Sequence, residues 1–123
     1  MIIWETNRGC PYKCTFCDWG SATNSKIRRF DHDILLQELE IFSDVGAELI
    51  FIADANFGIF KEEIQYIQKI CDLKKQTGYP KETFFSSAKN NKLVVNKSYA
   101  LLHEAGMLKT AHIAFQHTDD SVL

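Results

Sequence analysis

The chain has 123 residues, is 46% apolar and carries a formal net charge of −2. A chain of this length can form one compact domain that buries roughly two-thirds of its unfolded surface, and its apolar content argues against intrinsic disorder. The small net charge gives no general reason to expect nucleic acid or an anionic membrane as a partner, and no apolar run approaches the ~20 residues of a membrane span. Because the N-terminus also has no signal-peptide layout, we expect a cytoplasmic protein whose cysteines stay reduced.

The first predicted elements are a strand and a helix. Residues 2–6 are a short strand candidate, and a cysteine-rich loop follows it at once. Asp31 can cap a helix whose apolar positions include Leu35 and Leu39, and Gly46 provides the expected stop.

A second strand and helix come next. Residues 49–53 are a continuous apolar run, as in a parallel strand buried on both faces. Residues 54–58 are predicted to form a polar turn after this strand. A helix is then expected over residues 61–77, with Cys71 on its apolar stripe and Gly78 at its end.

The same alternation repeats in the last third of the chain. Residues 83–87 predict a third strand, and residues 98–105 predict a helix with Asn96 as its cap. Residues 110–115 predict a fourth strand. Alternating strands and helices predict an α/β fold with a parallel sheet and right-handed crossovers, in one domain over residues 1–123.

The last six residues have the pattern of a helix that begins: a capping hydroxyl, two acidic residues and then apolar ones. We therefore expect this single domain to be truncated. A fragment of this kind leaves a strand edge unpaired and is expected to self-associate.

Polar side chains collect where the predicted strands end. The carboxyl edge of a parallel sheet is where α/β proteins bind their ligands, and the cysteine loop follows the first strand onto the same edge. The polar residues at these strand ends are Asp54, Asn56, Ser86, Ser87 and Gln116.

Three of the four cysteines, Cys10, Cys14 and Cys17, lie within eight residues. Thiolates are soft ligands that suit zinc, copper(I) and iron–sulfur clusters. Four thiolates would close a structural zinc site or fully ligate a cubane, whereas three can hold three irons of a [4Fe–4S] cluster and leave the fourth open to a substrate. The spacing therefore favours a catalytic cluster over a structural metal.

The stretch NRGCPYKCTFCDWG, residues 7–20, carries a family resemblance. Cys10, Cys14 and Cys17 match the C-x3-C-x2-C signature of the radical S-adenosylmethionine (radical SAM) superfamily, and Phe16 fills its aromatic position. The surrounding residues look most like members that carry a cobalamin-binding domain. The resemblance implies a partial (βα) barrel, with about four βα units of a barrel of about six.

The resemblance also implies a reaction and its cofactors. A [4Fe–4S] cluster binds S-adenosylmethionine through the open iron and cleaves it to a 5′-deoxyadenosyl radical, which removes a substrate hydrogen. A reductant such as flavodoxin or ferredoxin supplies the electron, and in cobalamin-dependent relatives a methyl group also passes through cobalt.

Five further residues take cofactor-binding roles by the same resemblance. Asp54, Asn56 and Gly58 stand where the family places the motif that holds the methionyl amine, although the usual Gly-Gly-Glu is absent here. Gln116 resembles a ribose-binding position, and Phe16 would lie beside the adenine.

Other interpretations of the same residues stay open. The three cysteines could hold zinc with His32 as the fourth ligand, in a binding module with no catalytic role, or could serve an electron-transfer protein. Asp54 and Asn56 could be ordinary turn residues. Cys71 is expected to be a small buried hydrophobe.

Overall fold

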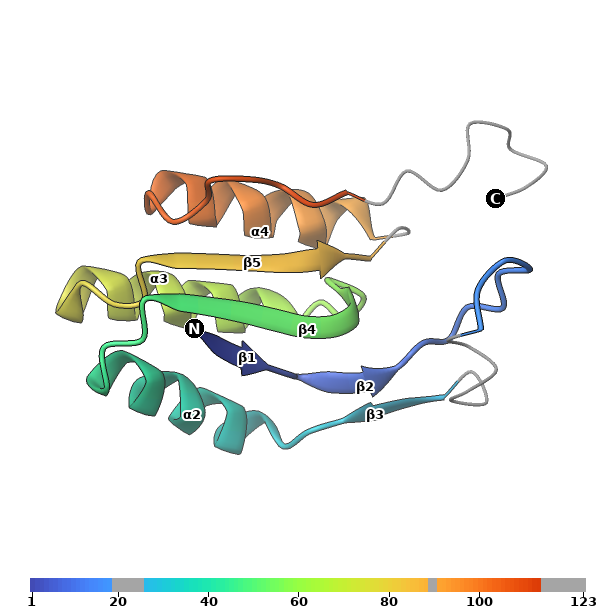
Figure 1. Cartoon of the computed structure of the whole chain (residues 1–123), viewed down its shortest axis with the longest axis horizontal. Helices are drawn as coiled ribbons and strands as arrows, with labels where there is room; N and C mark the ends of the chain where they lie inside the picture. The colour runs from blue at the N-terminus through green and yellow to red at the C-terminus, as the bar shows by residue number, and fades with distance from the viewer. Residues whose placement is uncertain (19–25, 89–90, 114–123) are drawn as a thin grey trace.

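The computed structural model describes residues 1–18, 26–88 and 91–113. A parallel sheet forms its centre, in the strand order β1 (Ile2–Trp4), β4 (Leu49–Phe57) and β5 (Glu82–Ser87). Two short strands, β2 (Asn7–Gly9) and β3 (Ile27–Arg29), pair antiparallel beside it. The parallel α/β fold predicted from the sequence is therefore confirmed (Figure 1).

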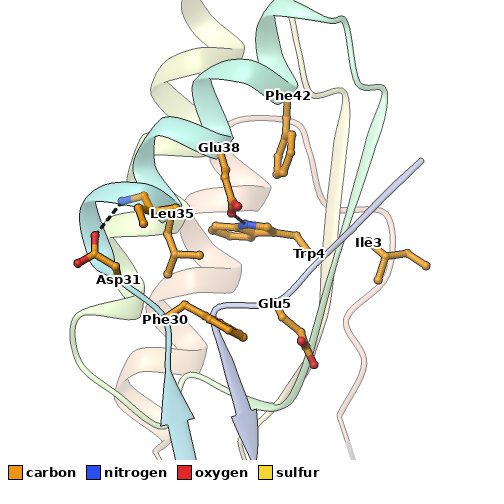
Figure 2. Close-up of a pocket in the computed structure, with 9 residues that line it drawn as sticks. Ile3, Trp4, Glu5, Phe30, Asp31, Leu35, Glu38 and Phe42 are labelled. Carbon is orange, nitrogen blue, oxygen red and sulfur yellow. Dashed lines mark hydrogen bonds between the residues drawn. The ribbon is translucent and has the colours of Figure 1, made fainter.

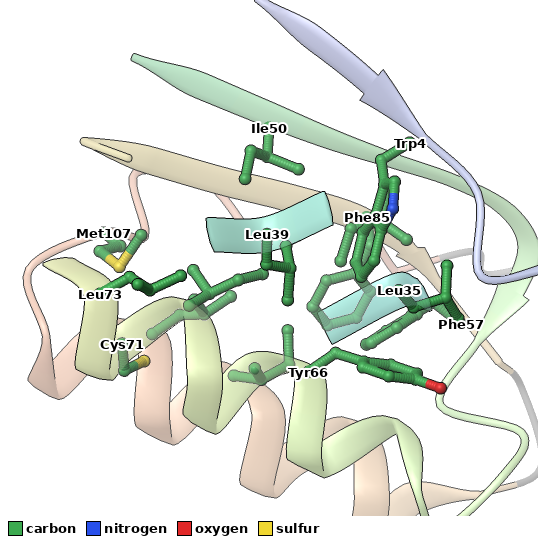
Figure 3. Close-up of a cluster of buried hydrophobic side chains, with 14 residues drawn as sticks. Trp4, Leu35, Leu39, Ile50, Phe57, Tyr66, Cys71, Leu73, Phe85 and Met107 are labelled. Atoms are coloured by element: carbon green, nitrogen blue, oxygen red, sulfur yellow. The ribbon is translucent and has the colours of Figure 1, made fainter. Parts of the chain in front are cut away.

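Three helices cover one face of the sheet: α2 (His32–Asp44), α3 (Glu63–Thr77) and α4 (Lys92–Glu104). The core between sheet and helices is shown in Figure 3, and its strand residues alternate as a sheet with one covered face requires. Ile50 and Ile52 of β4 point into this core and are fully buried. Phe51 lies between them on the opposite face, where its ring stacks on that of Phe84 at 4.6 Å.

Two predicted helices begin and end close to where the sequence places them. Asp31 caps α2, because its carboxylate accepts a hydrogen bond from the Ile34 amide at 3.0 Å. Leu35 and Leu39 are buried, as the spacing predicted. The helix α3 begins two residues later than expected and ends at Gly78, whose φ of +82° closes the last turn.

Three of the predictions are wrong. The strand predicted to be buried on both faces alternates in burial and is fully buried only on the face toward the helices. The polar turn predicted over residues 54–58 is instead the end of β4, which continues to Phe57 with a register shift against β5. The helix predicted from residue 98 begins at Lys92, and its cap is Asn91. Asn96 is exposed inside that helix, whose buried side begins at Val94. The residue type alone does not distinguish an asparagine inside a helix from one at its N-cap.

The pairing of β2 with β3 has no counterpart among the predicted elements, because strands of three residues give too short an alternation to recognise. Of the fourth predicted strand, residues 110–115, the structure describes a single parallel bridge between His112 and Ser86. Gln116 lies outside the described residues. No helix in the described ranges is long and apolar enough to cross a membrane.

Candidate cluster and cofactor site

The cysteine loop leaves β2 at the end of the molecule where β4 and β5 also finish (Figure 1). Cys10 is only 9% exposed, Cys14 is half-buried and Cys17 is exposed. The Cys17 amide donates a hydrogen bond to the Cys14 carbonyl at 3.1 Å, so these two cysteines lie on one tight turn. Exposure to solvent therefore increases along the loop from Cys10 to Cys17.

The thiols are carried on one segment but are not gathered around a common point. Within the described ranges, no group of three or more His, Cys, Asp or Glu side chains converges as a metal site. His32, the fourth ligand of the zinc interpretation, lies in α2 with its Nδ1 3.1 Å from the Tyr66 hydroxyl. Three cysteines on one loop are a donor set that suits an iron–sulfur cluster or zinc, and the zinc interpretation with His32 stays a prediction.

Cys71 has a different environment from the loop cysteines. It is buried in α3, and its thiol donates to the Leu101 carbonyl oxygen at 3.6 Å. Burial raises the pKa of this thiol, which disfavours the thiolate that a metal needs. The predicted structural role of Cys71 agrees with this position.

Asn56 joins β4 to the cysteine loop. Its side-chain amide donates a hydrogen bond to the Cys10 sulfur, with Nδ2 and Sγ 3.1 Å apart. The predicted contact between Asn56 and S-adenosylmethionine stays a prediction, and the structure adds a contact that the sequence did not suggest.

Asp54 lies two residues earlier in β4 and is 2% exposed. Its side chain is on the same sheet face as Ile52, toward the helices. Its Oδ1 accepts from the backbone amides of Thr6 at 2.7 Å and Asn7 at 3.3 Å. Its Oδ2 accepts from the Thr6 hydroxyl, and from Asn7 Nδ2 at 3.1 Å. The carboxylate therefore holds the chain just before the cysteine loop.

Glu63, the first residue of α3, completes this network. Its Oε1 accepts from Asn7 Nδ2 at 2.8 Å. Its Oε2 accepts from the amides of Gly58 at 2.8 Å and Phe60 at 2.9 Å, which fixes the turn after β4. Sequence reasoning missed Glu63, although a charged residue on the buried stripe of Ile67 and Ile70 was the available signal.

Burial changes the acidity of both carboxyl groups. Desolvation raises the pKa of Asp54 to about 6, against the opposing hydrogen bonds from Thr6 and Asn7. Desolvation likewise raises the pKa of Glu63 to about 7, and the nearby Asp54 charge adds to it while the Phe60 and Gly58 amides oppose it. The charge of this network therefore changes near neutral pH.

Two other predicted cofactor residues lie at the same end of the sheet. Gly58 follows β4 with a φ of +95°, and a Cβ added there would lie 2.8 Å from Val95 Cγ2. This turn therefore packs so closely on α4 that it requires glycine. Phe16 is 58% exposed on the cysteine loop. Their contacts with a cofactor stay predictions.

A pocket of about 350 Å³ lies between β1 and α2 and contains none of the predicted cofactor residues (Figure 2). Its polar groups already have structural partners. Glu38 accepts a hydrogen bond from Trp4 Nε1 at 2.7 Å, and Asp31 caps α2. We therefore place the candidate site at the cysteine loop and the end of β4.

Comparison with known proteins identifies a family for the chain. A family model described as the radical SAM superfamily matches residues 4–123. Two curated relatives align over 121 residues: a 2-(S-pantetheinyl)-carbapenam-3-carboxylate methyltransferase of Streptantibioticus cattleyicolor, 42% identical, and the cobalamin-dependent radical SAM methyltransferase TokK of Streptomyces tokunonensis, 40% identical. Each alignment covers 98% of this chain and 18% of the relative, so the chain spans about a fifth of their length.

Proposed function

Because this chain belongs to the radical SAM superfamily, we propose that Cys10, Cys14 and Cys17 hold a [4Fe–4S] cluster that cleaves S-adenosylmethionine reductively. One observation carries the proposal: three thiols on a single loop, at the carboxyl end of a parallel sheet. When bound, the cluster supplies an electron that breaks a carbon–sulfur bond of the sulfonium and so allows a substrate hydrogen to be removed.

The residues around the loop have supporting roles in this proposal. Asp54 acts by fixing Thr6 and Asn7, because its oxygens already accept four hydrogen bonds. Glu63 holds the turn at Gly58, which then presents its backbone to the methionyl group of S-adenosylmethionine. In this proposal, the buried carboxylates hold the backbone in place, and the loop and turn that they hold contact the ligand.

Phe16 and Gln116 remain our candidates for the adenine and ribose of S-adenosylmethionine. Phe16 is exposed on the cysteine loop, so its ring is accessible to a base. For Gln116 the proposal rests on the family resemblance alone.

For the longer protein we propose cobalamin-dependent methyl transfer within a complete (βα) barrel. The relatives support this: both are named as methyltransferases and one as cobalamin-dependent. A cytoplasmic reductant such as flavodoxin or ferredoxin would supply the electron. The three parallel strands and the parallel bridge at His112 support this proposal, because a (βα) barrel is built from such parallel pairings.

Iron content of cysteine variants tests the proposal. The natural-length protein that contains this chain is reconstituted anaerobically, and iron is measured for the alanine variants of each cysteine. We expect about four irons per chain in the wild type and in Cys71→Ala, and a strong loss in Cys10→Ala, Cys14→Ala and Cys17→Ala. A colourless wild type that retains one tight zinc would instead favour the zinc module, and a cluster that depends on Cys71 would contradict the ligand assignment.

A further inference from the structure

We propose that Asn56 donates a hydrogen bond to the Cys10 thiolate of the bound cluster and thereby raises its reduction potential. The inference rests on the proposed function, because it needs Cys10 to be a cluster ligand. Its basis is the distance of 3.1 Å between Asn56 Nδ2 and Cys10 Sγ, which joins residues far apart in the sequence. Cys10 is the buried member of the three cysteines, so water does not readily replace this donor.

The position of Asn56 is set by a strand and not by the loop. Asn56 and Asp54 are two residues apart near the end of β4, and both bind the segment that leads into the cysteine loop. Asp54 holds the backbone amides of Thr6 and Asn7, and Asn56 reaches the first sulfur. The donor is therefore positioned by β4, and its acceptor follows a segment that the buried Asp54 holds in place.

The electrostatic effect has a definite sign. One-electron reduction adds negative charge to the cluster and its thiolates. The amide N–H directs its positive end at a sulfur and so stabilises the reduced form more than the oxidised form. Removing the donor should therefore make the cluster harder to reduce, which means a lower potential.

This role differs from the contact with S-adenosylmethionine that the family resemblance assigns to Asn56. A residue that binds the methionyl amine controls affinity for S-adenosylmethionine. A residue that bonds a ligand sulfur controls the reduction equilibrium even when no S-adenosylmethionine is present. The two roles can therefore be separated by measuring the potential of the cluster alone.

The experiment compares Asn56→Leu with the wild type in the reconstituted natural-length protein, titrated with dithionite without S-adenosylmethionine. Leucine is close to asparagine in size and has no donor. Asn96→Leu, the same change on the exposed side of α4, is the matched control. We expect Asn56→Leu to retain the cluster and to lose about tenfold in the equilibrium constant for reduction, equivalent to about 59 mV for one electron. Asn96→Leu should match the wild type.

An unchanged potential in Asn56→Leu would overturn the inference, and an unchanged potential with weaker S-adenosylmethionine binding would return Asn56 to its predicted role. If Asn56→Leu fails to hold iron, a second measurement decides. Wild-type protein with ¹⁵N in its asparagine side-chain amides should show weak ¹⁵N hyperfine coupling in the pulsed EPR spectrum of the reduced cluster. Absence of this coupling overturns the inference. A wild type that binds no cluster would instead refute the proposed function.

Discussion

At the residue scale, the network around Asp54 and Glu63 buries two acidic groups in one place. Burying an ionised carboxylate costs free energy. Hydrogen bonds to the carboxylate offset this cost, and protonation removes the charge. Here hydrogen bonds from Thr6, Asn7 and backbone amides offset part of this cost, and raised pKa values show that part remains. The folded protein therefore binds protons in this network that the unfolded chain would release.

A pH dependence of stability follows, and its sign can be worked out. Because folding raises the pKa of Glu63 from 4.5 to about 7, the folded state holds more protons than the unfolded state between these values. Stability from this group is therefore present at low pH and is lost as the pH rises through about 7, by at most about 1.4 kcal/mol per pH unit. Glu63→Gln removes the titration, so the variant should gain stability relative to wild type as the pH rises from about 5 to about 8.

Urea unfolding across this pH range measures the difference between wild type and Glu63→Gln. The adjacent Glu62 is the matched control, because its side chain is 53% exposed and forms an ion pair with Arg29 at 3.7 Å. Glu62→Gln should follow the wild type at every pH. A stability difference for Glu63→Gln that stays constant with pH would show that Glu63 does not titrate in this range.

At the element scale, the short pair β2–β3 forms the base of the cysteine loop. Gly9 ends β2 with a φ of +115° and pairs with Ile27. A Cβ added at Gly9 would collide with the Lys26 carbonyl oxygen, which is backbone and cannot turn aside. The last residue before Cys10 must therefore be glycine for the two strands to meet.

We expect Gly9→Ala to lower both stability and iron incorporation. Gly78→Ala is the matched control, because Gly78 also has a positive φ but would have nothing within 4 Å of the new Cβ. The control should lose about 1–2 kcal/mol from backbone strain alone. Gly9→Ala should lose clearly more and should bind less iron after reconstitution. Similar losses in both variants would show that the close approach to Lys26 has no effect.

Sequence alone predicted the long elements and their order, because the helical spacing of Leu35 and Leu39 and the apolar run of residues 49–53 are long enough to recognise. It could not predict the antiparallel pair that holds the cysteine loop, since Asn7–Gly9 is too short to show a pattern. The cysteines were found from spacing, but the network of Asp54 and Glu63 was not. Its members come from three separate elements, and only the fold brings them together.

At the scale of the whole molecule, the helices cover one face of the sheet and leave the other face with apolar side chains. Ile3 is 65% exposed on that face and pairs in register with Phe51, whose ring stacks on that of Phe84. Within the described residues β1 pairs with β4 alone. The backbone N–H and C=O groups on the outer edge of β1 therefore have no strand partner there. Both features are typical of a surface that needs further protein to cover it.

A protein made of only these 123 residues should therefore self-associate. Sedimentation should show species larger than a monomer, and thermal melting should begin at a lower temperature than in a version extended by about two βα units, each of roughly 30 residues. Ile3→Lys, which places a charge on the exposed face, should reduce the association. A monomeric fragment as stable as the extended version would contradict this prediction.

The outer part of the cysteine loop is exposed, so proteases can reach it. Lys13 lies exposed between Cys10 and Cys14, so trypsin can reach the bond after it while the loop is open. Once three sulfurs wrap a cluster, the loop can no longer extend into the cleft of a protease. Resistance to tryptic cleavage after Lys13 would therefore report cluster loading directly, without absorbance or activity.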